Sequence, residues 1–121
     1  MTNLALIVED EAALRIIYEA VLSNLGFEVL QAADGEEAIS LLEHFAPSIV
    51  FLDILLPKVD GSQVLDYIQS TPHLHHTATV VVTAHSRFEH IIRLESHDRF
   101  LLKPVRPLDI QAAARQVLAP Y

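Results

Sequence analysis

The 121-residue chain contains no cysteine and no tryptophan, and it has only three glycines. Without cysteine it can form no disulfide framework, thiolate nucleophile or thiolate zinc site. None of the glycines lies directly after the first apolar run. The chain therefore lacks the glycine-rich phosphate loop that a small flavin or nucleotide binder of this size would use.

Basic residues are also scarce, since 8 Lys and Arg stand against 16 Asp and Glu, for a net charge of −8. This balance argues against binding nucleic acid by neutralising its phosphates. No apolar run approaches the roughly 18 residues of a membrane span, and Met1-Thr2-Asn3 lacks the basic start of a signal peptide. We therefore expect a soluble cytoplasmic protein that contacts neither nucleic acid nor membrane. It would be a single domain over residues 1–121, with no output domain attached.

Short apolar runs alternate with longer stretches in which apolar residues recur every three or four positions. The runs cover residues 4–8, 29–32, 49–52, 78–84 and 100–102. Because these runs are mainly apolar and do not alternate with polar residues, we expect strands that are buried on both faces and covered by helices. The alternation predicts a doubly wound α/β fold in which five parallel strands alternate with five helices.

Local signals place the ends of the expected helices. The first helix runs through the periodic segment 14–25 and stops at Gly26, a residue suited to the left-handed conformation. Asp34 and Glu37 form an acidic variant of the capping box for a second helix that reaches Pro47. Apolar residues at 64–68, 88–92 and 110–118 mark the other three helices, of which we expect the fourth to be short or irregular. The polar segment 71–77 is predicted to be a loop.

Chemically active side chains follow four of the five runs, at the point where each strand would end. Glu9, Asp10 and Glu11 come after the first run, and Asp53 comes directly after the third. Thr83 is the second-to-last residue of the fourth run, and Lys103 follows the fifth. The carboxyl ends of parallel strands meet at one edge of a sheet, which is where ligands of such folds bind. We therefore expect these side chains to converge.

The convergence predicts phosphoryl chemistry. Clustered carboxylates repel one another, and a hard divalent cation such as Mg²⁺ relieves that repulsion. A carboxylate can also attack phosphorus to give an acyl phosphate, and Asp53, flanked by apolar residues, is the best-placed nucleophile. Glu9 and Asp10 would hold the metal, while Lys103 and Thr83 would hold phosphoryl oxygens.

Four segments, at 6–11, 51–61, 81–84 and 101–104, resemble the receiver domains of two-component response regulators, in the same order and each at a strand end. The resemblance extends from about Leu4 to Leu118. It implies a flavodoxin-like fold with strand order 2-1-3-4-5, Mg²⁺ as cofactor, and phosphorylation of Asp53 by a sensor histidine kinase or a histidine phosphotransfer protein in a phosphorelay. It implies a signalling domain that is not an enzyme toward other substrates and catalyses only its own phosphorylation and dephosphorylation. An unidentified downstream protein would read the face formed by the fourth helix, fifth strand and fifth helix, and a homodimer through that face stays open.

The resemblance also assigns finer roles. It implies that Asp53 and the backbone carbonyl of Leu55 join Glu9 and Asp10 as metal ligands. It also implies that a cis peptide bond precedes Pro104 and that Thr83 and Phe100 form a switch. Phe100 has no hydroxyl where tyrosine is frequent, so a plain core residue is the competing interpretation. Leu55 and His85 lie where family members tune dephosphorylation. Because an apolar Leu55 cannot orient an attacking water, we expect a long-lived phosphoryl group.

Two other functions would draw on the same residues. A phosphatase that passes through an aspartyl phosphate usually has a second aspartate two residues after the nucleophile, where this chain has Leu55, and this argues against that activity. A receiver-like adaptor that binds proteins without being phosphorylated is the alternative that stays open. The clustered histidines His73, His75 and His76 favour a solvated loop over a metal site, because no acidic residue lies near them in the sequence.

Overall fold

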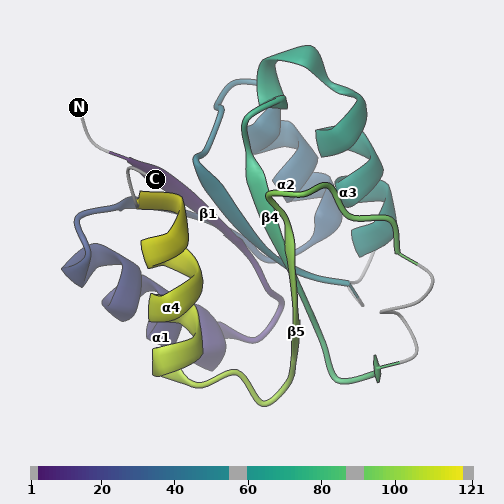
Figure 1. Cartoon of the computed structure of the whole chain (residues 1–121). Coiled ribbons are helices and arrows are strands. Elements are labelled where there is room, and N and C mark those ends of the chain that lie inside the picture. The colour runs from purple at the N-terminus through teal and green to yellow at the C-terminus, as the bar shows by residue number, and fades with distance from the viewer. Residues whose placement is uncertain (1–2, 55–59, 87–91, 119–121) are drawn as a thin grey trace.

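The computed structural model describes residues 3–54, 60–86 and 92–118 and shows one parallel sheet of five strands (Figure 1). The strands are β1 (Leu4–Val8), β2 (Glu28–Ala32), β3 (Ile49–Asp53), β4 (Ala78–Thr83) and β5 (Arg99–Leu102). Their order is β2-β1-β3-β4-β5, and every pairing is parallel. The flavodoxin-like order that the sequence predicts is confirmed.

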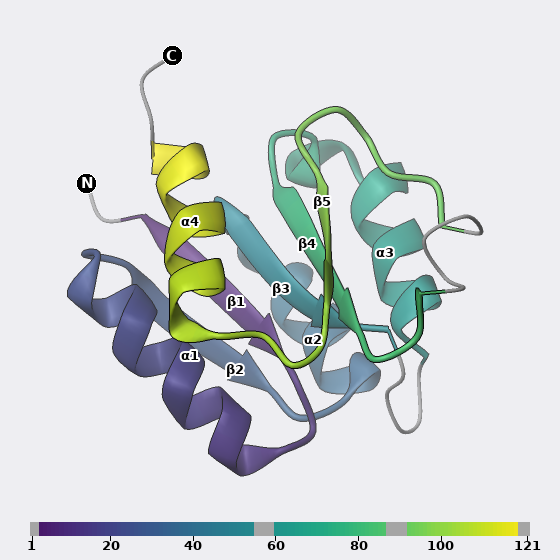
Figure 2. The same cartoon turned by 60° about the horizontal axis from the view of Figure 1, so that its bottom comes forward.

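Among the described residues, four helices cover the sheet, two on each face (Figure 2). They are α1 (Ala12–Asn24), α2 (Gly35–Leu42), α3 (Gly61–Ser70) and α4 (Pro107–Leu118), with a single 3₁₀ turn, η1 (Pro72–Leu74), before β4. Neighbouring strand residues enter different layers: Leu6 joins the core under α2 and α3, whereas Ile7 joins the core under α1 and α4. Burial on both faces explains why the three central strands, β1, β3 and β4, are almost wholly apolar, whereas the edge strands β2 and β5 are only partly buried.

The helix ends largely follow their local signals. Gly26 has φ +93°, the left-handed conformation expected after α1. Asp34 accepts a hydrogen bond from the Glu37 amide, as its capping role predicts. The predicted extension of α2 to Pro47 is wrong, because the helix ends at Leu42 and Phe45 is 43% exposed. Two amides bond to the Leu41 carbonyl there, which tightens the last turn before the chain enters β3.

The polar segment 71–77 packs against the body of the protein more than a solvated loop would. Leu74 is buried, and the Thr77 hydroxyl donates to the Pro47 carbonyl at 2.7 Å. The ring of His73 contacts the Leu42 carbonyl at 2.7 Å. His75 and His76 are exposed, in line with the prediction.

The predicted fourth helix falls mostly outside the described residues, since Phe88 and Ile91 belong to the range 87–91. Ile92 is described and lies in a bend, and residues 92–98 form no α-helix. Ile92 and Leu94 nevertheless pack against the core beside Phe100. Within the described ranges, no helix has both the length and the apolar character that a membrane crossing requires.

Candidate functional site

The loop after β1 holds Glu9 in a buried position, with its side chain 2% exposed. The Glu9 amide donates to the Ala32 carbonyl at 3.0 Å, which carries the pairing with β2 one residue past β1. The Arg15 guanidinium donates to the Glu9 carbonyl at 2.8 Å, and the Glu11 amide donates to Glu9 Oε2 at 3.1 Å. Main chain and carboxylate are therefore both fixed, while the neighbouring Asp10 is exposed.

Asp53 is the last residue of β3 and is 7% exposed. The start of α3 lies directly against this strand end: a Cβ added to Gly61 would be 2.5 Å from Ile54 Cα and 2.6 Å from the Asp53 carbonyl oxygen. Asp60 caps the helix through the Ser62 amide, within a capping box. In the sequence, Asp60-Gly61 is only part of a motif, so the steric role of Gly61 becomes visible only in the folded chain.

Lys103 brings the separate strand ends together. Its amide donates to the Thr83 carbonyl at 2.8 Å, and a cis peptide bond joins it to Pro104, as the resemblance implies. Its ammonium lies 2.9 Å from Asp53 Oδ2 and 3.1 Å from Glu9 Oε1. Residues far apart in the sequence thus meet at the carboxyl edge of the sheet.

Glu9, Asp10 and Asp53 form a group in which one carboxylate oxygen from each lies within 4.8 Å of the others. Across the ranges 3–54, 60–86 and 92–118 it is the only group of three such donors. An all-oxygen, carboxylate-rich set of this kind fits a hard divalent cation such as Mg²⁺. The fourth predicted ligand, the backbone carbonyl of Leu55, lies outside the described residues.

The electrostatics of the site favour added positive charge. Burial raises the pKa of Glu9, and its contact with Asp10 adds to this, although the Glu11 amide and Lys103 act in the opposite direction. Burial lowers the pKa of Lys103, but its bonds and charge interactions with Asp53 and Glu9 outweigh this and raise it overall. Burial and the charges of Glu9 and Asp53 also raise the pKa of Tyr18. A second cation would therefore be stabilised here.

Thr83 lies at the end of β4, buried at 1% exposure, and its hydroxyl accepts a hydrogen bond from the His85 amide at 3.2 Å. The side chain of His85 is exposed. Phe100 is paired with Val81 in register and packs, partly buried, against the core under α2 and α3. This packing fits the core interpretation of Phe100, and the proposed switch with Thr83 stays a prediction.

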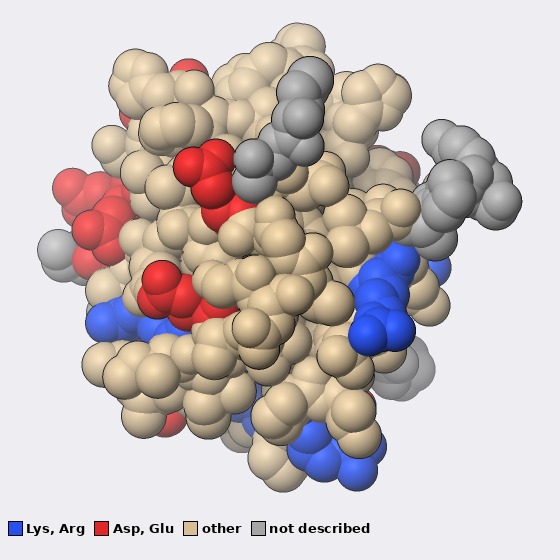
Figure 3. Space-filling model, turned by 90° about the vertical axis from the view of Figure 1, so that its left-hand side faces the viewer, with Lys and Arg blue, Asp and Glu red and all other residues tan. Residues whose placement is uncertain are grey.

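An apolar cavity of about 370 Å³ adjoins the site, and sequence analysis did not find it. It lies where α1 approaches the chain after β5, and Ile17, Tyr18 and Val105 line it together with Lys103. Figure 3 views the side of the molecule where α1 and α4 lie; most of that surface is uncharged, and the charged side chains form small separate groups. Three segments far apart in the sequence build the cavity, so no sequence pattern predicts it.

Comparisons with known proteins agree with this geometry. The family model described as response regulator receiver domain matches residues 5–115. The chain is 36% identical over 115 residues to the probable transcriptional regulator ycf27 of Porphyridium aerugineum, covering 93% of this chain and 47% of that protein. It is 38% identical over 115 residues to the protein of the same name in Guillardia theta, covering 93% and 44%. The chain thus spans about half the length of these curated relatives.

Solved structures show the same fold. The chemotaxis response regulator CheY4 of Vibrio cholerae matches with a TM-score of 0.84 at 20% identity, over 97% of this chain and 99% of that one. The receiver domain of the hybrid histidine kinase CckA matches with a TM-score of 0.80 at 28% identity, over 97% and 100%. The chain belongs to the response regulator receiver domain family of two-component signalling.

Proposed function

We propose that Asp53 accepts a phosphoryl group, with Mg²⁺ as cofactor, from the phosphohistidine of a sensor histidine kinase or a histidine phosphotransfer protein. One observation carries the proposal: the Lys103 ammonium touches both Asp53 and Glu9 in a group that also contains Asp10. An isolated acidic helix start would need no lysine held against it from the end of another strand. The family to which the chain belongs supports the same chemistry.

The transfer would begin with ionised Asp53. One of its carboxylate oxygens attacks phosphorus, an O–P bond forms, and the P–N bond to the donor's imidazole breaks. The electron pair of that bond goes to the imidazole, which leaves as a neutral ring when its other nitrogen carries a proton. Bound Mg²⁺ would supply positive charge that offsets the negative charge on the phosphoryl oxygens.

The residues of this chain would position the phosphoryl group. Lys103 reaches the Asp53 carboxylate at 2.9 Å, and its ammonium would hold a phosphoryl oxygen once that carboxylate carries the phosphoryl group. The Thr83 hydroxyl, at the end of the neighbouring strand, would hold a second oxygen. Glu9 and Asp10 supply the remaining carboxylates for the cation.

The signalling face in this proposal consists of β5, α4 and the segment between β4 and β5. β5 is the edge strand of the sheet, with Leu102 48% exposed, and Leu108 at the start of α4 is 68% exposed. A downstream protein, or a second copy of the chain, would cover such apolar side chains. Phosphorylation at the adjoining strand ends would change this face through Thr83 and Lys103.

The deciding experiment is the intact mass of the protein after incubation with Mg²⁺ and a small acyl phosphate. We expect one phosphoryl adduct that requires Mg²⁺ and disappears in Asp53→Asn. The matched control is Asp66→Asn, an exposed aspartate of α3, which should keep the adduct. If no adduct forms and a beryllium fluoride mimic of the phosphoryl group causes no response, the phosphorylation-independent adaptor replaces this proposal.

A further inference from the structure

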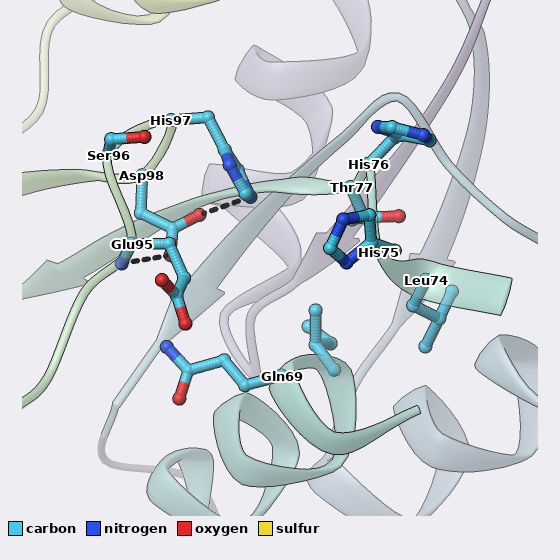
Figure 4. A pocket seen from close by; sticks show the side chains of 10 residues that line it. Gln69, Leu74, His75, His76, Thr77, Glu95, Ser96, His97 and Asp98 are labelled. Atoms are coloured by element: carbon cyan, nitrogen blue, oxygen red, sulfur yellow. Dashed lines mark hydrogen bonds and ion pairs between the residues drawn. The ribbon is translucent and has the colours of Figure 1, made fainter. Parts of the chain in front are cut away.

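Several histidines gather at the amino ends of the strands, opposite the Asp53 site. His75 and His76 precede β4, and His97 precedes β5. Together with Glu95, Asp98 and Gln69 they line a cavity of about 400 Å³. Figure 4 shows His97 and His75 reaching toward this cavity from opposite sides. The fold therefore supplies the acidic neighbours that the histidine cluster lacks in the sequence.

Asp98 fixes one wall of the cavity. Its side chain is 2% exposed, Oδ1 accepts the Thr79 amide at 2.8 Å, and Oδ2 accepts the Glu95 amide at 2.9 Å. The same carboxylate lies 3.5 Å from His97 Nε2. In metal sites a carboxylate commonly holds one nitrogen of an imidazole, which orients the ring so that the other nitrogen binds the ion.

We infer that this cavity binds a divalent transition-metal ion, with imidazole nitrogens of His75 and His97 and the carboxylate of Glu95 as ligands. His76 is the candidate fourth ligand, since its ring centroid lies 5.0 Å from that of His75. Mixed imidazole and carboxylate donors suit Zn²⁺, whereas Mg²⁺ prefers the all-oxygen group at the other end of the sheet.

The donors are not yet gathered around a point. Among the described residues, only Glu9, Asp10 and Asp53 lie close enough together to count as a ready group. His75, His97 and Glu95 are all exposed, so their side chains can rotate toward the cavity. Binding must order them, which makes the site weaker than a preformed structural zinc site. A bound ion would tie the chain before β4 to the chain before β5 and stabilise both.

The test is a calorimetric titration of the full chain with Zn²⁺, in an Asp10→Asn/Asp53→Asn background so that the acidic group takes no zinc. We expect one ion per chain. His97→Ala and His75→Ala should each weaken binding by about tenfold or more. His44→Ala is the matched control, because His44 is exposed and lies outside the cavity lining, and it should leave the affinity unchanged.

A second readout guards against variants that merely unfold. Zn²⁺ should raise the thermal unfolding midpoint of the Asp10→Asn/Asp53→Asn protein. It should not raise the midpoint when His97→Gln is added to that protein, and circular dichroism checks that this variant is folded. Zinc should also shift the NMR signals of the His75 and His97 rings before those of His44. The inference is overturned if no zinc binds, if His75→Ala and His97→Ala bind as tightly as their parent, or if His44→Ala weakens binding equally. None of these results depends on phosphorylation of Asp53.

Discussion

The ammonium of Lys103 lies 2.9 Å from Asp53 Oδ2 and 3.1 Å from Glu9 Oε1. One cation from the chain after β5 is thus shared by two buried carboxylates, one after β1 and one at the end of β3. A divalent ion would bind the same two carboxylates, so Lys103 and the ion would oppose each other in binding, while in our proposal both would assist phosphoryl transfer. The two effects can be separated by experiment.

Lys103→Met should therefore change two measurements in opposite directions. Phosphorylation of Asp53 by a small donor should slow by about 100-fold, because one stabilising charge on the phosphoryl oxygens is lost. Mg²⁺ should bind severalfold more tightly by calorimetry, since a positive charge beside the ion has been removed. Arg106→Met, at an exposed side chain, is the control for loss of a cation. Weaker Mg²⁺ binding in Lys103→Met would contradict this account of the site.

The raised pKa of Glu9 predicts how stability depends on pH. Because burial raises this pKa, the folded, ion-free protein holds the Glu9 proton more tightly than the unfolded chain does. The resulting stabilisation is complete below the ordinary glutamate pKa and is lost as pH rises through the raised value. Urea denaturation in EDTA should show this loss, and Mg²⁺ should reverse it at the upper end of the window by binding the ionised group.

Glu9→Gln tests that assignment, because an amide cannot titrate. The variant should lose the part of the pH dependence that lies just above the ordinary glutamate pKa, and it should bind Mg²⁺ more weakly at pH 7. Glu36→Gln, at an exposed glutamate of α2, should leave both properties unchanged. An unaltered pH profile in Glu9→Gln would assign the dependence to another group.

Gly61 and Gly26 predict two different kinds of defect. Alanine at Gly61 would place a Cβ 2.5 Å from Ile54 Cα, so α3 or the end of β3 must move, at a cost of about 1–3 kcal/mol. Alanine at Gly26 meets no atom within 4 Å but must adopt φ +93°, at a cost of about 1–2 kcal/mol. Denaturation should show both losses. Only Gly61→Ala should also slow phosphorylation, because it shifts Asp53. An unchanged rate would mean that α3 moves to relieve the clash and leaves Asp53 in place.

The predictions that the structure confirms rest either on local sequence patterns or on the fact that the carboxyl ends of parallel strands meet at one edge of the sheet. The apolar runs, the Asp34 cap and the convergence of Glu9, Asp53 and Lys103 are of this kind. What the sequence did not show depends on contacts between distant segments. The helix α2 was predicted to reach Pro47 but ends at Leu42, where the chain turns toward β3. The periodicity of apolar residues does not indicate this turn. The close packing of Gly61 against Ile54 and the cavity that His97 and His75 both line likewise require the assembled fold.

The phosphoryl lifetime depends on Leu55 in our proposal. An apolar side chain two residues after Asp53 cannot orient water for attack on the acyl phosphate, so phosphorylated protein should lose its adduct slowly. Leu55→Asn should shorten the lifetime severalfold, as followed by intact mass after removal of the donor. Leu108→Asn, at an exposed position on α4, should not. Rapid loss of phosphate from the unaltered protein would remove this explanation.

Thr79 and Thr77 form a matched pair for testing buried hydroxyls. Thr79 is 0% exposed, and its hydroxyl finds no hydrogen-bond partner among the described residues. Thr79→Val should therefore stabilise the protein by about 1 kcal/mol, because an unsatisfied polar group becomes a methyl group.

Thr77→Val should do the opposite. The Thr77 hydroxyl donates to the Pro47 carbonyl at 2.7 Å, and its loss should cost about 1–2 kcal/mol. Urea denaturation followed by circular dichroism gives the free energy of unfolding of both variants. The two variants have the same change of side chain in the same part of the fold. A loss of stability in Thr79→Val comparable to that in Thr77→Val would show that the Thr79 hydroxyl contributes a bond to the folded state.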